Sequence, residues 1–174
     1  TGKALENGQI EVDMGSPDFA PSSLPLKLEE QTHYELNFNG KVLHFAALSM
    51  GNPHVVIVLD DLEFMADEEY LAEIGEYLQS SELFPESVNV NFVYKIADSQ
   101  LGLRTYERGC GFTLACGSGA CASAAVAIRD GLVCSPVEVF MPGGELILSY
   151  RNANLFMRGD ATHVFDGEIE LCRN

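Results

Sequence analysis

Alternating hydrophobic and polar residues predict β-strands along most of this chain. Two alternating runs, residues 34–38 and 41–48, are separated by Asn39-Gly40, which is typical of a two-residue hairpin turn. Pro142-Gly143-Gly144 separates a second pair of runs and predicts a second hairpin. In all, the pattern predicts strands at 9–14, 34–38, 41–48, 55–59, 88–96, 101–106, 137–141, 145–150, 154–158 and 162–165, with a closing strand that ends at Leu171.

Two segments have helical patterns of different kinds. Residues 67–80 place apolar side chains on one stripe with acidic residues opposite, which predicts an amphipathic surface helix capped by Asp67. Residues 120–128 contain no charge, glycine or proline and are mostly small, which predicts a helix buried on every side. Ser118 is the expected N-cap of this second helix, and Gly131 is the expected glycine just beyond its end.

Together these elements predict an α+β fold. We expect a mixed, largely antiparallel sheet, curled into a barrel-like wrap around the small-residue helix. A length of 174 residues suits a single domain, residues 1–174, and the polar residues 1–8 are expected to be a loose end. His163 is expected to be an ordinary residue of the sheet.

Composition narrows the class of partner. The formal charge of −16 and the isoelectric point near 4.4 argue against nucleic acid or an anionic membrane as partner. No signal peptide is expected, and the sequence contains no apolar run of transmembrane length. The five cysteines have no regular spacing, which indicates reduced thiols and a cytoplasmic protein, and no zinc site is expected.

Cys116 lies where the small-residue helix is expected to begin. Free N–H groups and the helix dipole at that position favour an anion, so they should lower the pKa of the thiol or hold a ligand carboxylate. Position alone favours the alternative that Cys116 is simply a small buried residue. Glu107 and Arg108 reduce that preference, because a carboxylate and a guanidinium beside a thiol suit a zwitterionic ligand such as an amino acid.

Polar residues elsewhere are open to two interpretations. Asn52-Pro53-His54 precedes a buried strand, and an Asn-Pro pair initiates turns without any catalytic role. Asn89 and Asn91 share one face of the strand at 88–96, and one or both could simply be solvated.

The run from Glu107 to Ala122 reads ERGCGFTLACGSGACA, and it resembles the second catalytic-cysteine motif of diaminopimelate epimerases. That family comprises cofactor-independent amino-acid racemases. The resemblance extends from Val12 to Gly167. Proline racemase-like proteins lack the Glu-Arg-Gly lead-in, and the phenazine-biosynthesis-like isomerases have no cysteine at this point.

Two features depart from the family pattern. Phe112 stands where the family usually has a glutamate. The Gly-Asn-Gly-x-Arg-Cys-like stretch, which carries the other cysteine in the first half of such enzymes, does not occur here. The resemblance therefore implies a single C-terminal epimerase-type domain, with the N-terminal half absent from this chain.

The resemblance implies interconversion of LL- and meso-diaminopimelate, in lysine and peptidoglycan precursor biosynthesis, with no cofactor and no metal. Two thiols on opposite faces of the α-carbon would act as base and acid. Its partners would be diaminopimelate and the missing N-terminal half, and a homodimer is compatible with it. By the same resemblance, Cys116 would be an acid/base, and Gly117 and Ser118 would donate N–H groups to the carboxylate at the reacting centre. Asn52, Asn89 and a buried Arg108 would bind the distal carboxylate. Glu107 would bind an ammonium group and assist Cys116, and His54 would assist the absent cysteine.

Two other functions remain open from the sequence. One is a related racemase or isomerase of another small amino or hydroxy acid, and the other is a non-catalytic ligand-binding domain. Because one acid/base group cannot invert a centre alone, we expect the isolated chain to fold but to be inactive. We also expect Cys116 to be uncovered and reactive without the missing half.

Overall fold

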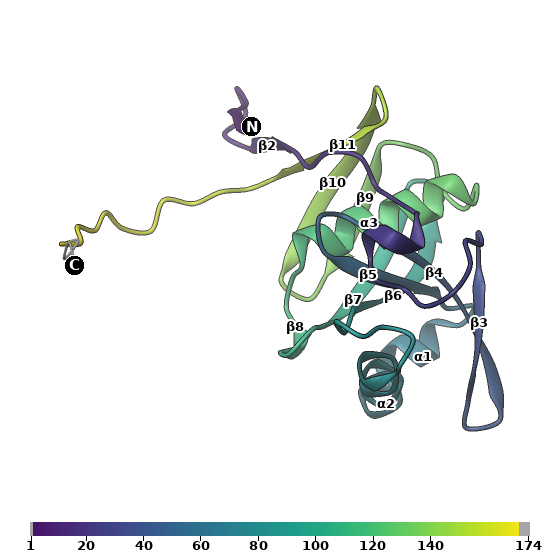
Figure 1. The fold of residues 1–174 in the computed structure, drawn as a ribbon. Helices are drawn as coiled ribbons and strands as arrows, with labels where there is room; N and C mark the ends of the chain where they lie inside the picture. The colour runs from purple at the N-terminus through teal and green to yellow at the C-terminus, as the bar shows by residue number, and fades with distance from the viewer. Residues whose placement is uncertain (1, 171–174) are drawn as a thin grey trace.

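One curved sheet of eleven strands dominates the computed structural model, which describes residues 2–170 (Figure 1). In chain order the strands are β1 Gly2–Ala4, β2 Ile10–Asp13, β3 Tyr34–Phe38, β4 Lys41–Ser49, β5 Pro53–Val58, β6 Asn89–Ala97, β7 Gln100–Glu107, β8 Gly111–Thr113, β9 Val137–Met141, β10 Gly144–Arg151 and β11 Asn154–Gly159. The short β8, which the sequence pattern did not predict, pairs with β7 only.

The strand order is β1-β2-β11-β10-β9-β7-β6-β5-β4-β3. The β5–β6 and β7–β9 pairs are parallel, and the other pairs are antiparallel. The sheet does not close, but an isolated bridge between Asp18, which follows β2, and Ser49 at the end of β4 joins its two sides. The predicted fold class, a mixed and largely antiparallel sheet curled around one helix, is confirmed.

The central helix is α3, Gly117–Arg129. Nine consecutive residues, from Gly119 to Ala127, are buried, so the prediction of a helix buried on every side is confirmed. Gly131 adopts a φ of 70° beyond the helix end, as predicted. The predicted N-cap was wrong: the extended backbone of Cys116 makes it the N-cap, and Ser118 lies within the first turn.

A second layer covers the opposite face of the sheet. It contains α1, Leu62–Ala66, and α2, Glu68–Ser80. A separate 3-10 turn, Pro21–Ser23, follows β2 in the chain. The Asp67 carboxylate accepts the N–H of Tyr70 at 3.0 Å, which confirms the predicted cap of α2. The pattern missed α1, which is only five residues long and is capped by Asp61. None of the helices within residues 2–170 has the length and apolar character needed to span a membrane.

The strands between these layers are buried on both faces. On β5 and β6, Val56 and Val93 belong to the core around α3, whereas Val55, Val90 and Phe92 belong to the core beneath α2. This alternation determines which side chains of the two strands point towards α3.

The first hairpin forms as the sequence predicts. Asn39 and Gly40 have φ values of 49° and 78°, the left-handed conformation that a type I′ turn requires at both central positions. The turn aligns Phe38 with Lys41 and fixes the register of β3 against β4. The second hairpin, β9–β10, also has the predicted turn.

The chain ends differ from the predictions. Gly2–Ala4 is not a loose end, because it pairs with β2. Residues 160–170 form no strand and extend away from the domain (Figure 1). Both edges of β11 are already occupied by β10 and β2, so the following residues find no free strand beside it. His163 is consequently not in the sheet but exposed, 3.0 Å from Asp166, and Leu171 lies outside the described residues.

Candidate active site

Strand register gathers buried polar side chains beside the start of α3. In the parallel β5–β6 pair, His54 lies opposite Asn89. In the antiparallel β6–β7 pair, Asn91 lies opposite Thr105. These four side chains are buried, so the alternative that one or both asparagines are simply solvated does not hold. Buried amide and imidazole groups require partners, and each of the four has at least one.

Cys116 lies at the amino end of α3 and is buried, with 7% of its surface exposed. Its sulfur is 3.6 Å from the Ser118 hydroxyl oxygen. The expectation of an uncovered thiol is therefore wrong for this chain, because the α3 start lies against the sheet.

The pKa of the Cys116 thiol is raised, not lowered as the helix-start argument predicted. Burial is the largest cause, and the negative charge of Glu107 acts in the same direction. The Ser118 hydroxyl and the Gly119 N–H lower the pKa but do not outweigh burial. The resting group is therefore a protonated thiol.

Glu107 and Arg108 lie at the end of β7. The Glu107 carboxylate accepts a hydrogen bond from the Thr113 hydroxyl across the β7–β8 pair. The Asn89 amide holds this region to β5: its oxygen accepts the Arg108 backbone N–H at 3.0 Å, and its nitrogen donates to the Pro53 carbonyl at 3.0 Å. Asn89 thus fixes the position of the loop that carries Arg108.

Arg108 itself is exposed, contrary to the expectation that it is buried. Its guanidinium donates to the Glu86 carbonyl at 2.8 Å. The positive charge still affects the site, because it contributes to the lowered pKa of His54.

His54 and Asn52 connect the strand to the helix start. His54 Nε2 is 3.0 Å from Asn52 Oδ1, and Asn52 Nδ2 donates to the Ser118 hydroxyl oxygen at 3.4 Å. Burial, followed by the charge of Arg108, lowers the pKa of His54 to about 4. His54 is therefore neutral near pH 7. The structure thus joins Asn52, His54, Ser118 and Cys116 in one set of contacts, with Gly117 as the first helical residue.

Asn91, Thr105 and Gly119 also lie at this site, although the sequence pattern indicated no role for them. Asn91 donates to His54 Nδ1 at 3.1 Å, and the Thr105 hydroxyl donates to Asn91 Oδ1 at 3.0 Å. A Cβ on Gly119 would lie 2.5 Å from Asn91 Oδ1 and 3.2 Å from the Cys116 sulfur. The face shared by Asn89 and Asn91 was a visible signal for Asn91, but Thr105 becomes evident only from the strand register.

Phe112, which stands where the family usually has a glutamate, packs against side chains of β6 and β7. Its ring meets the Tyr106 ring edge-on at 5.1 Å, and the Arg104 guanidinium lies 4.5 Å from its centroid. Arg104 in turn pairs with Glu68 of α2. An apolar ring therefore fits this position, since it is surrounded by aromatic and cationic groups.

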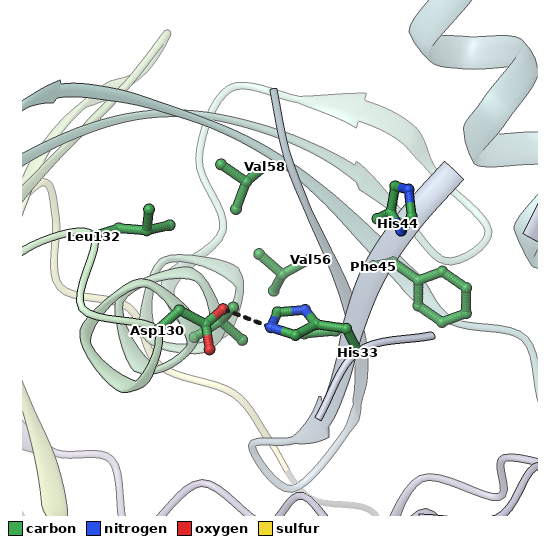
Figure 2. A pocket seen from close by; sticks show the side chains of 9 residues that line it. His33, His44, Phe45, Val56, Val58, Asp130 and Leu132 are labelled. Atoms are coloured by element: carbon green, nitrogen blue, oxygen red, sulfur yellow. Dashed lines mark ion pairs between the residues drawn. The ribbon is translucent and has the colours of Figure 1, made fainter. Parts of the chain in front are cut away.

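A separate cavity of about 290 Å³ lies at the other end of α3 (Figure 2). Its walls are mostly apolar, but they also include His33 and Asp130, which meet at 3.3 Å. Asp130 is the C-cap of α3, whereas Cys116 is the N-cap, so thirteen helical residues, about 20 Å, separate the Asp130 wall of this cavity from the thiol. Within residues 2–170, no three His, Cys, Asp or Glu side chains are placed to hold a metal ion.

The diaminopimelate epimerase family model matches residues 46–164, more than half of the chain. The chain belongs to the diaminopimelate epimerase family. The matched region contains every candidate site residue, from Asn52 to Ser118.

Solved structures share the fold at low sequence identity. A hydroxyproline epimerase from Agrobacterium vitis, solved with trans-4-hydroxy-L-proline, is 12% identical and superposes with a TM-score of 0.64 over 91% of this chain and 53% of its own. Phenazine biosynthesis proteins of the PhzF family from Bacillus anthracis and Enterococcus faecalis are 13% and 16% identical, with TM-scores of 0.53 and 0.54 over 98% of this chain. The chain covers 64% and 60% of those two proteins, so it spans less than two thirds of each of these three structures.

Proposed function

We propose that this chain is the C-terminal half of a diaminopimelate epimerase, which interconverts LL- and meso-diaminopimelate in the cytoplasm for lysine and peptidoglycan precursor biosynthesis. The observation that carries the proposal is the Cys116 thiol at the amino end of α3, with the Ser118 hydroxyl and the Glu107 carboxylate as neighbours. The family match supports the substrate class.

The reaction inverts one α-carbon by two proton transfers. A thiolate removes the α-proton from one face, and the electron pair of the broken C–H bond moves towards the α-carboxylate. A thiol then gives a proton to the opposite face, and the roles exchange in the reverse direction. The raised pKa of Cys116 suits the proton-donating role in the resting enzyme. The other thiol belongs to the absent half, and we propose no organic cofactor or metal.

Charge stabilisation must come from fixed donors near the carboxylate. The N–H groups of Gly117 and Ser118 lie at the start of α3, where they have no acceptor within the helix. We assign the distal carboxylate to Asn52, Asn89 and Arg108. Because both ends of the Asn89 amide already have protein partners, its contribution runs largely through the Arg108 loop. Glu107 would accept from an ammonium group and act on Cys116.

The surface beside Cys116 supports the missing-half proposal. Leu114 is 71% exposed, and Ala115 next to Cys116 is also exposed. Two open hollows meet at Ala115, one beside Arg104 and Pro142 and the other beside Met141 and Asp160. We propose that the N-terminal half covers this region and brings its own cysteine to the opposite face of the substrate.

The test is conversion of LL-diaminopimelate to the meso form by this chain alone, and again after the N-terminal half is added. We expect no activity from the chain alone and activity from the mixture, with a Cys116→Ala chain as the inactive control. Activity of the chain alone would contradict the two-half mechanism. A parallel assay with proline, hydroxyproline and other small acids tests the alternative of a related racemase: turnover of one of these in place of diaminopimelate would overturn the substrate assignment.

A further inference from the structure

An unbroken series of polar contacts runs from Thr105 on β7 to the sulfur of Cys116. It passes from the Thr105 hydroxyl to Asn91, from Asn91 to His54, from His54 to Asn52, and from Asn52 to Ser118, whose hydroxyl lies 3.6 Å from the Cys116 sulfur. Each of these groups can both donate and accept: the amides and the imidazole do so at different atoms, and the hydroxyls through one oxygen. The direction of one hydrogen bond therefore limits the direction of the next.

The direction is set at Asn91. Its nitrogen lies 2.9 Å from the Val55 backbone carbonyl, which can only accept, so this end of the amide must be the NH₂ group. The oxygen end then faces the Thr105 hydroxyl, which donates to it at 3.0 Å. Asn91 is fully buried, so no solvent is available to satisfy the amide if it were reversed.

The fixed Asn91 amide determines the state of His54. Since Asn91 donates to Nδ1 at 3.1 Å, Nδ1 must carry a lone pair and the imidazole proton must be on Nε2. Nε2 then donates to Asn52 Oδ1 at 3.0 Å, which turns the Asn52 NH₂ group towards Ser118. The lowered pKa of His54 agrees with a neutral ring.

The series ends at the thiol. The Ser118 oxygen accepts from Asn52 at 3.4 Å, so its own hydrogen is free to donate to the Cys116 sulfur 3.6 Å away, and it must do so once that sulfur is a thiolate, which can only accept. A hydroxyl that donates to sulfur stabilises the thiolate, which is the form that removes a proton. Asn91, although it does not touch Cys116, thus influences how readily the thiol ionises.

We propose that Asn91 is a positioning residue of the site: through His54 and Asn52 it orients the Ser118 hydroxyl towards Cys116 and favours the thiolate. The inference deepens the proposed epimerase function and rests on it for its biological meaning. The contacts themselves lie within this chain and can be tested without any turnover.

The first measurement is the tautomer of His54 in the unmodified chain, by ¹⁵N chemical shifts of the imidazole at pH 7. We expect a neutral ring protonated at Nε2. A ring protonated at Nδ1 or at both nitrogens would overturn the proposal, and no variant has to fold for this result.

The second measurement is the rate at which Cys116 reacts with a small thiol reagent at pH 8, followed by peptide mass mapping, because Cys110 and Cys134 are exposed. Asn91→Leu, of similar size but without an amide, should slow the reaction about tenfold, as expected for loss of a hydrogen bond to a charged group. Ser118→Ala should have a similar effect.

The double variant separates positioning from general loosening of the fold. If Asn91 acts through Ser118, Asn91→Leu in the Ser118→Ala background should change the rate less than twofold, because the pathway is already broken. Effects that multiply, or an unchanged rate in Asn91→Leu alone, would overturn the proposal. Epimerase activity on other substrates, or none at all, would contradict the proposed function and leave these results standing.

Discussion

The side-chain oxygen of Asn89 accepts the backbone N–H of Arg108 at 3.0 Å, across the ends of β6 and β7. These two residues were expected to act side by side on a ligand carboxylate. Their contact indicates two different roles: the buried Asn89 amide fixes the loop, while the exposed Arg108 guanidinium lies at the surface, where it donates to the Glu86 carbonyl. The direct contact of Asn89 with substrate stays a prediction.

Cys116→Ala in the complete enzyme should abolish epimerisation, with a loss of about 10³-fold or more, because an acid/base group is removed. Folding should be nearly unchanged, since the replacement is small. Turnover of LL-diaminopimelate and the circular dichroism spectrum check both parts.

Cys121→Ala is the matched control for that variant. Cys121 is fully buried on the same helix, and burial raises the pKa of its thiol to about 12, so it is not available as a base. Retained activity in Cys121→Ala beside a loss in Cys116→Ala is the expected pair of results. Near-normal turnover in Cys116→Ala would show that the two-thiol mechanism is incorrect.

Gly119→Ala should destabilise the chain by about 1–3 kcal/mol, the usual range for overpacking. Its Cβ would lie 2.5 Å from Asn91 Oδ1 and 3.0 Å from Thr105 Oγ1, and both atoms are held in buried hydrogen bonds. Gly117→Ala is the control in the same helical turn, because there the Cβ would meet the flexible Met157 sulfur at 3.1 Å. In urea denaturation, Gly119→Ala should have a clearly lower free energy of unfolding than Gly117→Ala. The reverse order would contradict this packing.

His54 should make the folded state less stable in acid. Its folded pKa of about 4 lies below the ordinary value of 6.5, so the unfolded chain binds the proton more readily between these two values. The contribution of neutral His54 to the free energy of unfolding is fully present above pH 6.5 and is lost as the pH falls towards 4. The total loss is about 3 kcal/mol for a pKa shift of this size. We expect His54→Asn to flatten this part of the curve in denaturation experiments at pH 7 and 4.5. An identical slope in both proteins would rule out a buried neutral His54.

Phe112→Glu restores the side chain that is usual in the family and should destabilise this chain by about 1–2 kcal/mol, since ring contacts are lost. The loss includes the edge-on contact with Tyr106 and the stacked Arg104. Phe112→Leu, which keeps an apolar group, should cost less. Thermal unfolding of the two variants provides the comparison, and equal or higher stability of Phe112→Glu would refute this explanation.

Local chemistry made much of the fold predictable. The small residues of α3 could only suit a buried helix, and Asn39-Gly40 could only suit a tight hairpin, because each depends on conformation within a few residues. The prediction of a strand at 162–165 was wrong, because strand formation depends on more than the local pattern. Its alternation was real, but a strand also needs a free neighbour, and β11 has none.

The candidate site was predictable only in part. The motif placed Cys116 at a helix start, but the sign of its pKa shift depends on burial by strands far away in the sequence. Thr105 gives no signal until β7 is aligned with β6, and only then does its hydroxyl meet Asn91. Single residue types thus indicate candidate groups, whereas register decides which of them act together.

The thinness of α3 has a consequence for the whole domain. Because its buried residues are Gly, Ala, Ser, Cys and Val, the helix has almost the diameter of its own backbone, and seven strands can approach it. The width of the helix therefore determines how tightly the sheet curves around it. A larger side chain at Ala124 or Ala125 would push several strands outwards at once, including those that carry His54 and Asn91. The sizes of the side chains two helical turns away from Cys116 thus determine how far His54 and Asn91 lie from the helix.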